Sequence, residues 1–150
     1  MGNVVWLFSY GSNDSDQLSD RIERHDFETK PAVAPDVERV FRGFSQRWRG
    51  GTASLEPRRD GRVFGYVSRL REGDLKKLDR FEGVGLGIYQ RWPLEVILEN
   101  GRRLGAEAYV HASTEFNPPS AEYLSAVART IGRFWRGARG PVTPSDIPIC

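Results

Sequence analysis

The segment VVWLFSYGSN, residues 4–13, decides how this chain folds and where its chemistry is expected. Residues 4–8 are continuously apolar, which is typical of a strand buried on both faces. The small and polar residues 9–13 that follow predict a tight loop. A loop between a buried strand and a helix presents backbone N–H groups at one point, which suits a carboxylate or another anion. The residues alone leave an ordinary strand–helix turn as the alternative.

The helix after this loop is expected to begin at Asp14, because Gln17 stands three residues later in the spacing of a capping box. Leu18 and Ile22 then fall on one face of the helix. That face is the one expected to pack on the protein core.

The middle of the chain favours strands. Residues 32–44 form a weaker extended region interrupted by Pro35, and residues 52–55 follow as a strand opened by two glycines. Asp60-Gly61 has the composition of a hairpin turn, which predicts a returning strand over residues 63–67.

Composition and charge limit the classes of function. The chain has 22 Lys and Arg against 20 Asp and Glu, a net charge of +2, so the arginine clusters at 42–49, 58–62 and 133–139 are largely balanced. A nucleic-acid binder usually has a stronger and more continuous basic excess, so we expect no nucleic-acid ligand. No apolar run approaches the roughly 20 residues of a membrane helix, so we expect no membrane partner.

The ends of the chain carry expectations about location. The first residues contain no basic segment followed by a long apolar one, which predicts no signal peptide. The single cysteine is Cys150, so no disulfide can form within the chain. We therefore expect a cytoplasmic protein.

A carboxylate at Glu82 stands out in the next segment. A short helix is predicted to start at residue 73 or 74 and to run through residue 81, with Gly83 ending it in the left-handed conformation. Leu75, Leu78 and Glu82 share one face of that helix. Burial on an apolar face and a place in the last helical turn would both raise the pKa of the carboxyl, as a general acid/base requires. The alternative is that the helix ends earlier and Glu82 points to water.

Other candidate sites are weaker. The glycine run 83–87 follows a helix and opens a strand, the reverse of a nucleotide-binding fingerprint, so we interpret it as a flexible pocket rim. Ser12 lacks the Gly-x-Ser-x-Gly elbow of a nucleophilic serine. His25, His111 and Cys150 have no ligand spacing, which predicts neither a metal nor another cofactor.

The remaining elements complete an α+β fold with a mixed, strongly curled sheet. A hairpin is predicted over residues 89–112 around Asn100-Gly101, with Glu107, Tyr109 and His111 on the face opposite Leu104, Ala106, Ala108 and Val110. A final helix is expected over residues 121–135. The domain is predicted to span residues 1–136, with residues 137–150 as a C-terminal tail that wraps the surface or is mobile.

These motifs, in this order, resemble the γ-glutamylcyclotransferase family, which includes AIG2-like proteins. Tyr10-Gly11-Ser12-Asn13 after a buried strand is similar to the family's signature loop. The segment LDRFEG at 78–83, followed by GIY at 87–89, resembles its Leu-Asp-x-x-Glu-Gly and Gly-x-Tyr pattern, whose glutamate is catalytic. Matches to its middle strands, closing strand and last helix extend the resemblance over roughly residues 4–135, at 48–53, 63–67, 108–109 and 118–123.

The resemblance implies a mixed sheet curled into an open barrel with flanking helices and a pocket at one end. It implies that Glu82 is the catalytic acid/base, that Tyr10, Gly11, Ser12 and Asn13 bind substrate, and that Tyr109 is a pocket tyrosine. The implied partner is a small γ-glutamyl substrate, and the implied assembly is compatible with a homodimer.

The implied reaction is attack of the α-amine of a γ-glutamyl amide on its own γ-carbonyl, which releases 5-oxoproline and a free amine. This reaction needs no serine, cysteine, metal or cofactor. Asn13 is nearer to the branch that acts on γ-glutamyl amino acids than to the branches with leucine at this position. A non-catalytic binding module on the same fold, or a nucleic-acid-associated domain that uses the arginine clusters, are the alternatives.

Overall fold

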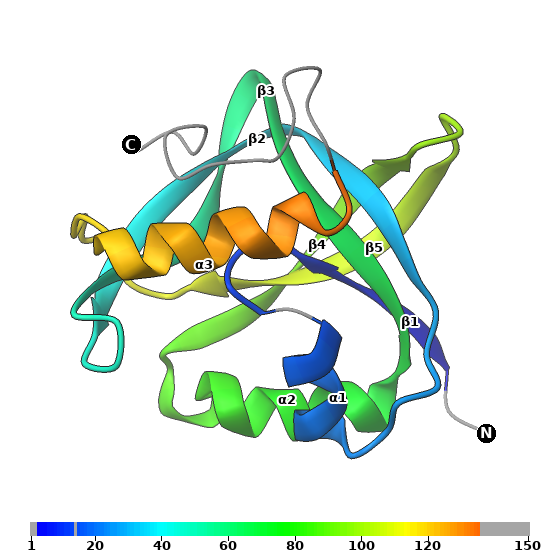
Figure 1. The fold of residues 1–150 in the computed structure, drawn as a ribbon, viewed down its shortest axis with the longest axis horizontal. Helices are drawn as coiled ribbons and strands as arrows, with labels where there is room; N and C mark the ends of the chain where they lie inside the picture. The colour runs from blue at the N-terminus through cyan, green and yellow to red at the C-terminus, as the bar shows by residue number, and fades with distance from the viewer. Residues whose placement is uncertain (1–2, 14, 136–150) are drawn as a thin grey trace.

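The computed structural model describes residues 3–13 and 15–135, and its elements follow one another as in Figure 1. The elements are β1 (Val4–Ser9), α1 (Ser15–Ile22), β2 (Thr29–Ser45), β3 (Gly50–Arg71), α2 (Glu72–Glu82), the short 3₁₀ helix η1 (Val84–Leu86), β4 (Tyr89–Leu98), β5 (Arg103–His111) and α3 (Ala121–Gly132). Asp14, the predicted helix cap, and the predicted tail 137–150 lie outside the described residues.

The five strands form a closed barrel in the order β1-β3-β2-β4-β5. All neighbouring strands are antiparallel except β1 and β5, which are parallel and close the barrel through the pair Leu7 and Glu107. Strands β2 and β4 are joined by only two pairs, Ala32 with Leu98 and Val33 with Ile97. The predicted α+β class with a curled mixed sheet is confirmed. The barrel is closed by the pairing of β1 with β5, whereas an open barrel was expected.

The predicted hairpin turn at Asp60-Gly61 is wrong. Strand β3 runs without a break from Gly50 to Arg71, and residues 58–61 form a bulge opposite Asp36 of β2. Asp60 takes a left-handed φ of 63°, and its backbone N–H donates to the Asp36 carboxylate at 3.1 Å. Turn residues also tolerate the left-handed backbone that a bulge requires, so their composition does not distinguish the two. The strands reverse between Ser45 and Gly50 instead.

Helix α2 is longer than predicted at both ends, because it starts at Glu72 and includes Glu82 as its last residue. Gly83 ends the helix with φ 66°, as predicted, and its N–H donates to the carbonyl of Arg80. The hairpin of β4 and β5 is confirmed. Helix α3 starts where expected and ends at Gly132, before the predicted end at residue 135.

The core has two parts. One cluster fills the barrel and is covered by α3, and the other lies between the barrel wall and helices α1 and α2 (Figure 1). Strand β5 supplies both, because Ala106, Ala108 and Val110 face the first cluster and Tyr109 faces the second, as the alternation predicts. Helices α1 and α2 pack side by side on the second cluster, with Leu18 and Leu78 fully buried there.

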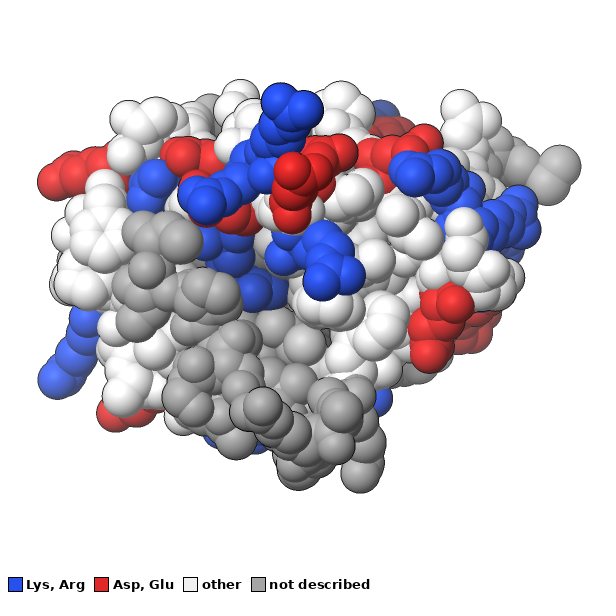
Figure 2. Space-filling model, turned by 90° about the horizontal axis from the view of Figure 1, so that it is seen from above, with Lys and Arg blue, Asp and Glu red and all other residues white. Residues whose placement is uncertain are grey.

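On the molecular surface, basic and acidic side chains are interspersed on the face that Figure 2 shows. Ion pairs on the protein surface include Arg58 with Glu38 and Arg103 with Glu95. Within the described ranges, no helix has the length and apolar character needed to cross a membrane.

Candidate active site

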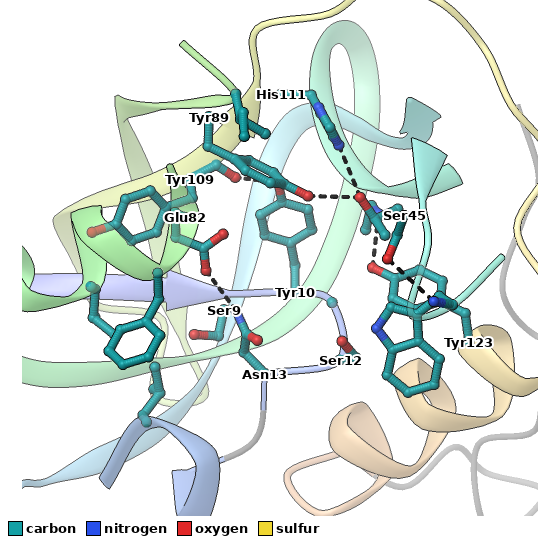
Figure 3. Close-up of a pocket in the computed structure, with 18 of the residues that line it drawn as sticks. Ser9, Tyr10, Ser12, Asn13, Ser45, Glu82, Tyr89, Tyr109, His111 and Tyr123 are labelled. Carbon is teal, nitrogen blue, oxygen red and sulfur yellow. Dashed lines mark hydrogen bonds between the residues drawn. The ribbon is translucent and has the colours of Figure 1, made fainter. Parts of the chain in front are cut away.

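A cavity of about 320 Å³ opens where several elements converge, and Figure 3 shows its lining. Its walls come from the end of β1 and the loop after it, α1, the C-terminal end of α2, the start of β4, the end of β5, the turn between β2 and β3 with the start of β3, and α3. This volume lies at the small end of the range for ligand pockets, which suits a molecule of about the size of a dipeptide. Glu82, Tyr10, Gly11, Ser12, Asn13 and Tyr109, the predicted site residues, all line it.

The structure places Glu82 in this cavity and not in open water. Its side chain is 11% exposed, and its Oε1 accepts a hydrogen bond from Nδ2 of Asn13 at 3.3 Å. A guanidinium nitrogen of Arg21 lies 3.5 Å from the same oxygen. Burial raises the pKa of the Glu82 carboxyl, whereas Arg21 and the Asn13 hydrogen bond lower it, and the net shift is upward. Glu82 therefore lies on the apolar face of its helix, as predicted. The sequence pattern did not reveal that the cation of Arg21 lies beside it.

The loop at residues 10–13 is fixed by hydrogen bonds to neighbouring strands, while several of its backbone N–H groups are left available. The Tyr10 hydroxyl donates to the backbone carbonyl of Tyr109, and the Tyr66 hydroxyl donates to the carbonyl of Asn13 at 2.6 Å. Within residues 3–13 and 15–135, the backbone N–H groups of Gly11, Ser12 and Asn13 donate no hydrogen bond. The loop can therefore offer these donors to a ligand, next to Glu82.

Behind this loop lies Arg39, which the sequence analysis missed. Its side chain points into the barrel like those of Val37 and Phe41, and the residue is only 7% exposed. Its Nε and Nη2 donate to the carbonyl of Tyr10 at 3.1 and 2.9 Å, and Nη2 also donates to the carbonyl of Phe64 at 3.1 Å. The only signal in the sequence is an arginine at an inward position of a strand.

Tyr109 borders the cavity, but its hydroxyl serves the helix behind it. The hydroxyl donates to Oδ1 of Asp79 at 2.7 Å and to the carbonyl of Leu75 at 3.1 Å. Arg91 holds the same Asp79 carboxylate with two further hydrogen bonds, at 2.9 and 2.6 Å. Tyr109 and Arg91 together therefore fix α2, and with it Glu82, against the sheet.

A chain of polar groups crosses another wall of the cavity. Thr52 Oγ1 is hydrogen-bonded to the Tyr89 hydroxyl at 2.7 Å and to Nε2 of His111 at 2.9 Å. Burial lowers the pKa of His111, which keeps its imidazole neutral at physiological pH. Tyr89 belongs to the Gly-x-Tyr segment, so the resemblance could have suggested it. His111 shares the strand face of Tyr109 and could have been suggested by alternation, whereas nothing in the sequence marked Thr52 for this site.

The wall farthest from Glu82 is formed by the turn between β2 and β3 together with α3, and Figure 3 shows Ser45 and Tyr123 there. The Trp48 ring packs 5.3 Å from the Tyr123 ring, and the Arg47 guanidinium lies 5.1 Å from the Trp48 ring. The glycine run 83–87, which was predicted to form a pocket rim, does not line the cavity, whereas the next residue, Ile88, does.

The described part of the chain contains no group of three or more His, Cys, Asp or Glu side chains that could hold a metal ion. The polar groups that line the cavity include one carboxylate, one imidazole, two guanidinium groups, several phenols and the loop amides.

Comparisons with known proteins agree with this arrangement. A profile of the AIG2-like family matches residues 62–133. The γ-glutamylcyclotransferase of Mus musculus is 30% identical over 136 residues, which cover 84% of this chain and 69% of the mouse protein. That of Homo sapiens is 32% identical over 83 residues, a match that covers 55% of this chain and 44% of the human protein.

A solved γ-glutamyl cyclotransferase structure superimposes with a TM-score of 0.77 at 25% identity, covering 85% of this chain and 78% of the other. Fold, order of motifs and identity over most of the chain thus agree, and this chain belongs to the AIG2-like, γ-glutamylcyclotransferase family.

Proposed function

We propose that this protein cleaves a γ-glutamyl amide by intramolecular attack of the substrate's α-amine on its γ-carbonyl. The C–N bond to the leaving amine breaks as the new ring C–N bond forms, and the products are 5-oxoproline and a free amine. The observation that carries the proposal is a buried carboxylate, Glu82, in a cavity of dipeptide size that is also lined by loop residues whose amides donate no hydrogen bond within the described part of the chain.

The substrate supplies its own nucleophile, so the protein needs to fold the substrate and move protons. Glu82 takes a proton from the α-ammonium, and the neutral amine attacks the γ-carbonyl. Glu82 then returns that proton to the departing nitrogen. The attacking nitrogen loses its second proton as it becomes the ring amide N–H, and the released amine takes up this proton and leaves as an ammonium. Holding the two ends of the substrate together is worth up to about 7–11 kcal/mol in well-oriented intramolecular reactions. Proton transfer by a positioned carboxylate contributes about 10²–10⁴-fold.

The surroundings of Glu82 suit both proton transfers. Burial brings the pKa of the carboxyl closer to neutrality, which makes it a better acid toward the leaving amine, while Arg21 keeps enough of it ionised to act first as a base. The N–H groups of Gly11, Ser12 and Asn13 are the donors available for the substrate carboxylate or for the oxyanion that develops on the γ-carbonyl oxygen.

The test is turnover of γ-glutamyl dipeptides, measured as 5-oxoproline release, by the wild type and by Glu82→Gln. Glutamine keeps the shape and can hydrogen-bond, but it cannot accept and return a proton. We expect kcat to fall by roughly 10²-fold or more, with substrate affinity changed only a few-fold. The matched control is Glu95→Gln, because Glu95 lies on β4 with its side chain 55% exposed and paired with Arg103.

Two results would count against the proposal. Wild-type kcat in Glu82→Gln would remove the residue from the reaction. Binding of γ-glutamyl dipeptides by the wild type without any 5-oxoproline would favour the alternative, a non-catalytic binding module on the same fold.

A further inference from the structure

Arg39 is a buried cation that forms no ion pair with a carboxylate of residues 3–13 or 15–135. Only 7% of the residue is exposed, and its three recorded hydrogen bonds all end on backbone carbonyls, those of Tyr10 and Phe64. Among the described residues, the charged or ionisable groups that act on the guanidinium are the phenols of Tyr123 and Tyr10. An isolated buried charge is costly, so such groups are normally paired with an opposite charge.

Neither phenol supplies that opposite charge. Burial raises the pKa of the Tyr10 phenol well above its ordinary value, and burial raises the pKa of the Tyr123 phenol to about 12. Both phenols are therefore neutral at physiological pH. Burial also lowers the pKa of Arg39, but only to about 10, so the guanidinium stays charged. The interior beneath the loop thus carries a positive charge that the described residues leave uncompensated.

The hydrogen bonds of Arg39 point to where the missing negative charge belongs. Two of them fix the Tyr10 carbonyl toward the barrel interior. The Tyr10–Gly11 peptide is trans, and in a trans peptide the N–H points opposite to the C=O. The Gly11 N–H is therefore directed away from Arg39 toward the cavity, which Gly11 lines. A cation on the carbonyl side also polarises the peptide and strengthens its N–H as a donor.

We propose that Arg39 is the positioning residue behind the substrate loop, and that its charge makes the cavity select a ligand with a carboxylate at the Gly11 N–H. The proposal rests on the proposed function, in which that carboxylate is the α-carboxylate of the γ-glutamyl group. The ligand carboxylate then balances the charge of Arg39, with the Tyr10–Gly11 peptide between the two charges. An uncharged analogue of the same shape does not balance that charge.

The expected selectivity follows from the electrostatics. For unit charges ~6–8 Å apart at an effective dielectric of ~20, a carboxylate ligand gains on the order of thirtyfold to a hundredfold in affinity over its neutral amide. Added salt should change this ratio little, because a buried pair is screened much less than an exposed one.

The experiment compares 5-oxoproline with 5-oxoprolinamide, its uncharged counterpart, by calorimetric titration. Arg39→Gln removes the charge but keeps a donor for the Tyr10 carbonyl, and Arg39→Lys keeps the charge but loses the planar fork. We expect Arg39→Gln to lose the preference for the carboxylate and Arg39→Lys to keep most of it. Arg58→Gln is the control, because Arg58 is exposed and paired with Glu38.

Unfolding temperatures of all variants separate this role from a structural one, since replacing a buried charge by a neutral group is often neutral or stabilising. An unchanged carboxylate preference in Arg39→Gln would overturn the proposal. So would an equal loss for both ligands in both variants, which would indicate a structural role. The wild type gives a test that needs no variant, because a preference below threefold, or one abolished by salt, is also incompatible with a buried counter-charge.

Glutarate, which cannot cyclise, separates this proposal from the proposed function. Arg39-dependent binding of glutarate by a protein that releases no 5-oxoproline would refute the proposed function and leave the role of Arg39 standing. Release of 5-oxoproline by a protein whose affinity for glutarate is the same with and without the Arg39 charge would support the proposed function and refute the role of Arg39.

Discussion

Replacing Arg91 by methionine should destabilise the protein at neutral pH and much less in acid. Arg91 donates two hydrogen bonds to Asp79 and one to Glu72 at 2.7 Å, so it clamps both halves of α2 to strand β4. Its side chain is 19% exposed and that of Asp79 23% exposed, which places the cluster between a buried and a surface ion pair. Methionine keeps most of the apolar stem and removes only the charge and the donors.

The expected loss is about 2–3 kcal/mol near pH 7, because hydrogen bonds to charged groups are worth ~1.5–3 kcal/mol when buried and partial exposure discounts each. For a chain of this length that corresponds to a fall in Tm of roughly 5–10 °C. The hydrogen bond from Arg91 is the largest cause of the lowered pKa of Asp79. A lowered folded-state pKa stabilises above the unfolded-state value and is lost as the pH falls through the folded-state value. The difference between wild type and variant should therefore be full above pH ~5 and shrink below pH ~4, near the ordinary aspartate pKa of ~3.9.

Urea unfolding of both proteins between pH 7.5 and the lowest pH at which each stays folded measures this. Arg103→Met is the control, since Arg103 and its partner Glu95 are 61% and 55% exposed and should contribute less than about 1 kcal/mol. A loss for Arg91→Met that equals the control, or that stays constant as the pH falls, would refute the reasoning.

Two further predictions concern residues in and beside the cavity walls. Gly43→Ala should lower the free energy of unfolding in urea by about 2 kcal/mol or more, because φ is 63° and the new Cβ would lie 2.5 Å from Cε1 of His111. Gly101→Ala is the control for backbone strain alone, because φ is 85° and no atom lies within 4 Å of its new Cβ; equal losses of stability in the two variants would exclude a contribution from the contact with His111. Arg21→Met should move the acid limb of the kcat/KM profile to higher pH, because Arg21 lowers the pKa of Glu82 and the base must be ionised; an unmoved limb would contradict the assignment of Glu82.

The local pattern of the chain was sufficient for elements whose signals are local. The apolar run at residues 4–8 became β1, Gly83 became the left-handed end of α2, and Asn100-Gly101 became the turn between β4 and β5. Asp60-Gly61 failed because its neighbours in space are residues of β2, and pairing with a distant strand decides between a turn and a bulge.

The site divides in the same way. Glu82 could be found because helical periodicity puts it on the face of Leu75 and Leu78. Arg39 and Thr52 could not, since each is an ordinary strand residue until strand register brings Thr52 to the cavity and Arg39 to a place behind its loop. The alternation of side chains along β5 predicted the face on which Tyr109 lies. It could not predict the partner of the Tyr109 hydroxyl, because that partner is Asp79 of α2.

The two sides of the cavity differ in how much change they can absorb. Glu82 sits on a helix that Tyr109 and Arg91 tie to the sheet, so substitutions near it disturb the packing of several elements at once. The opposite wall is a tight turn between two strands, with Arg47 and Phe44 exposed. Surface turns of this kind accept replacement and insertion far more readily than packed helices. Under the proposed function, variation of this turn would change the leaving group that a member of this fold prefers, while Glu82 and the loop that serve ring closure are kept.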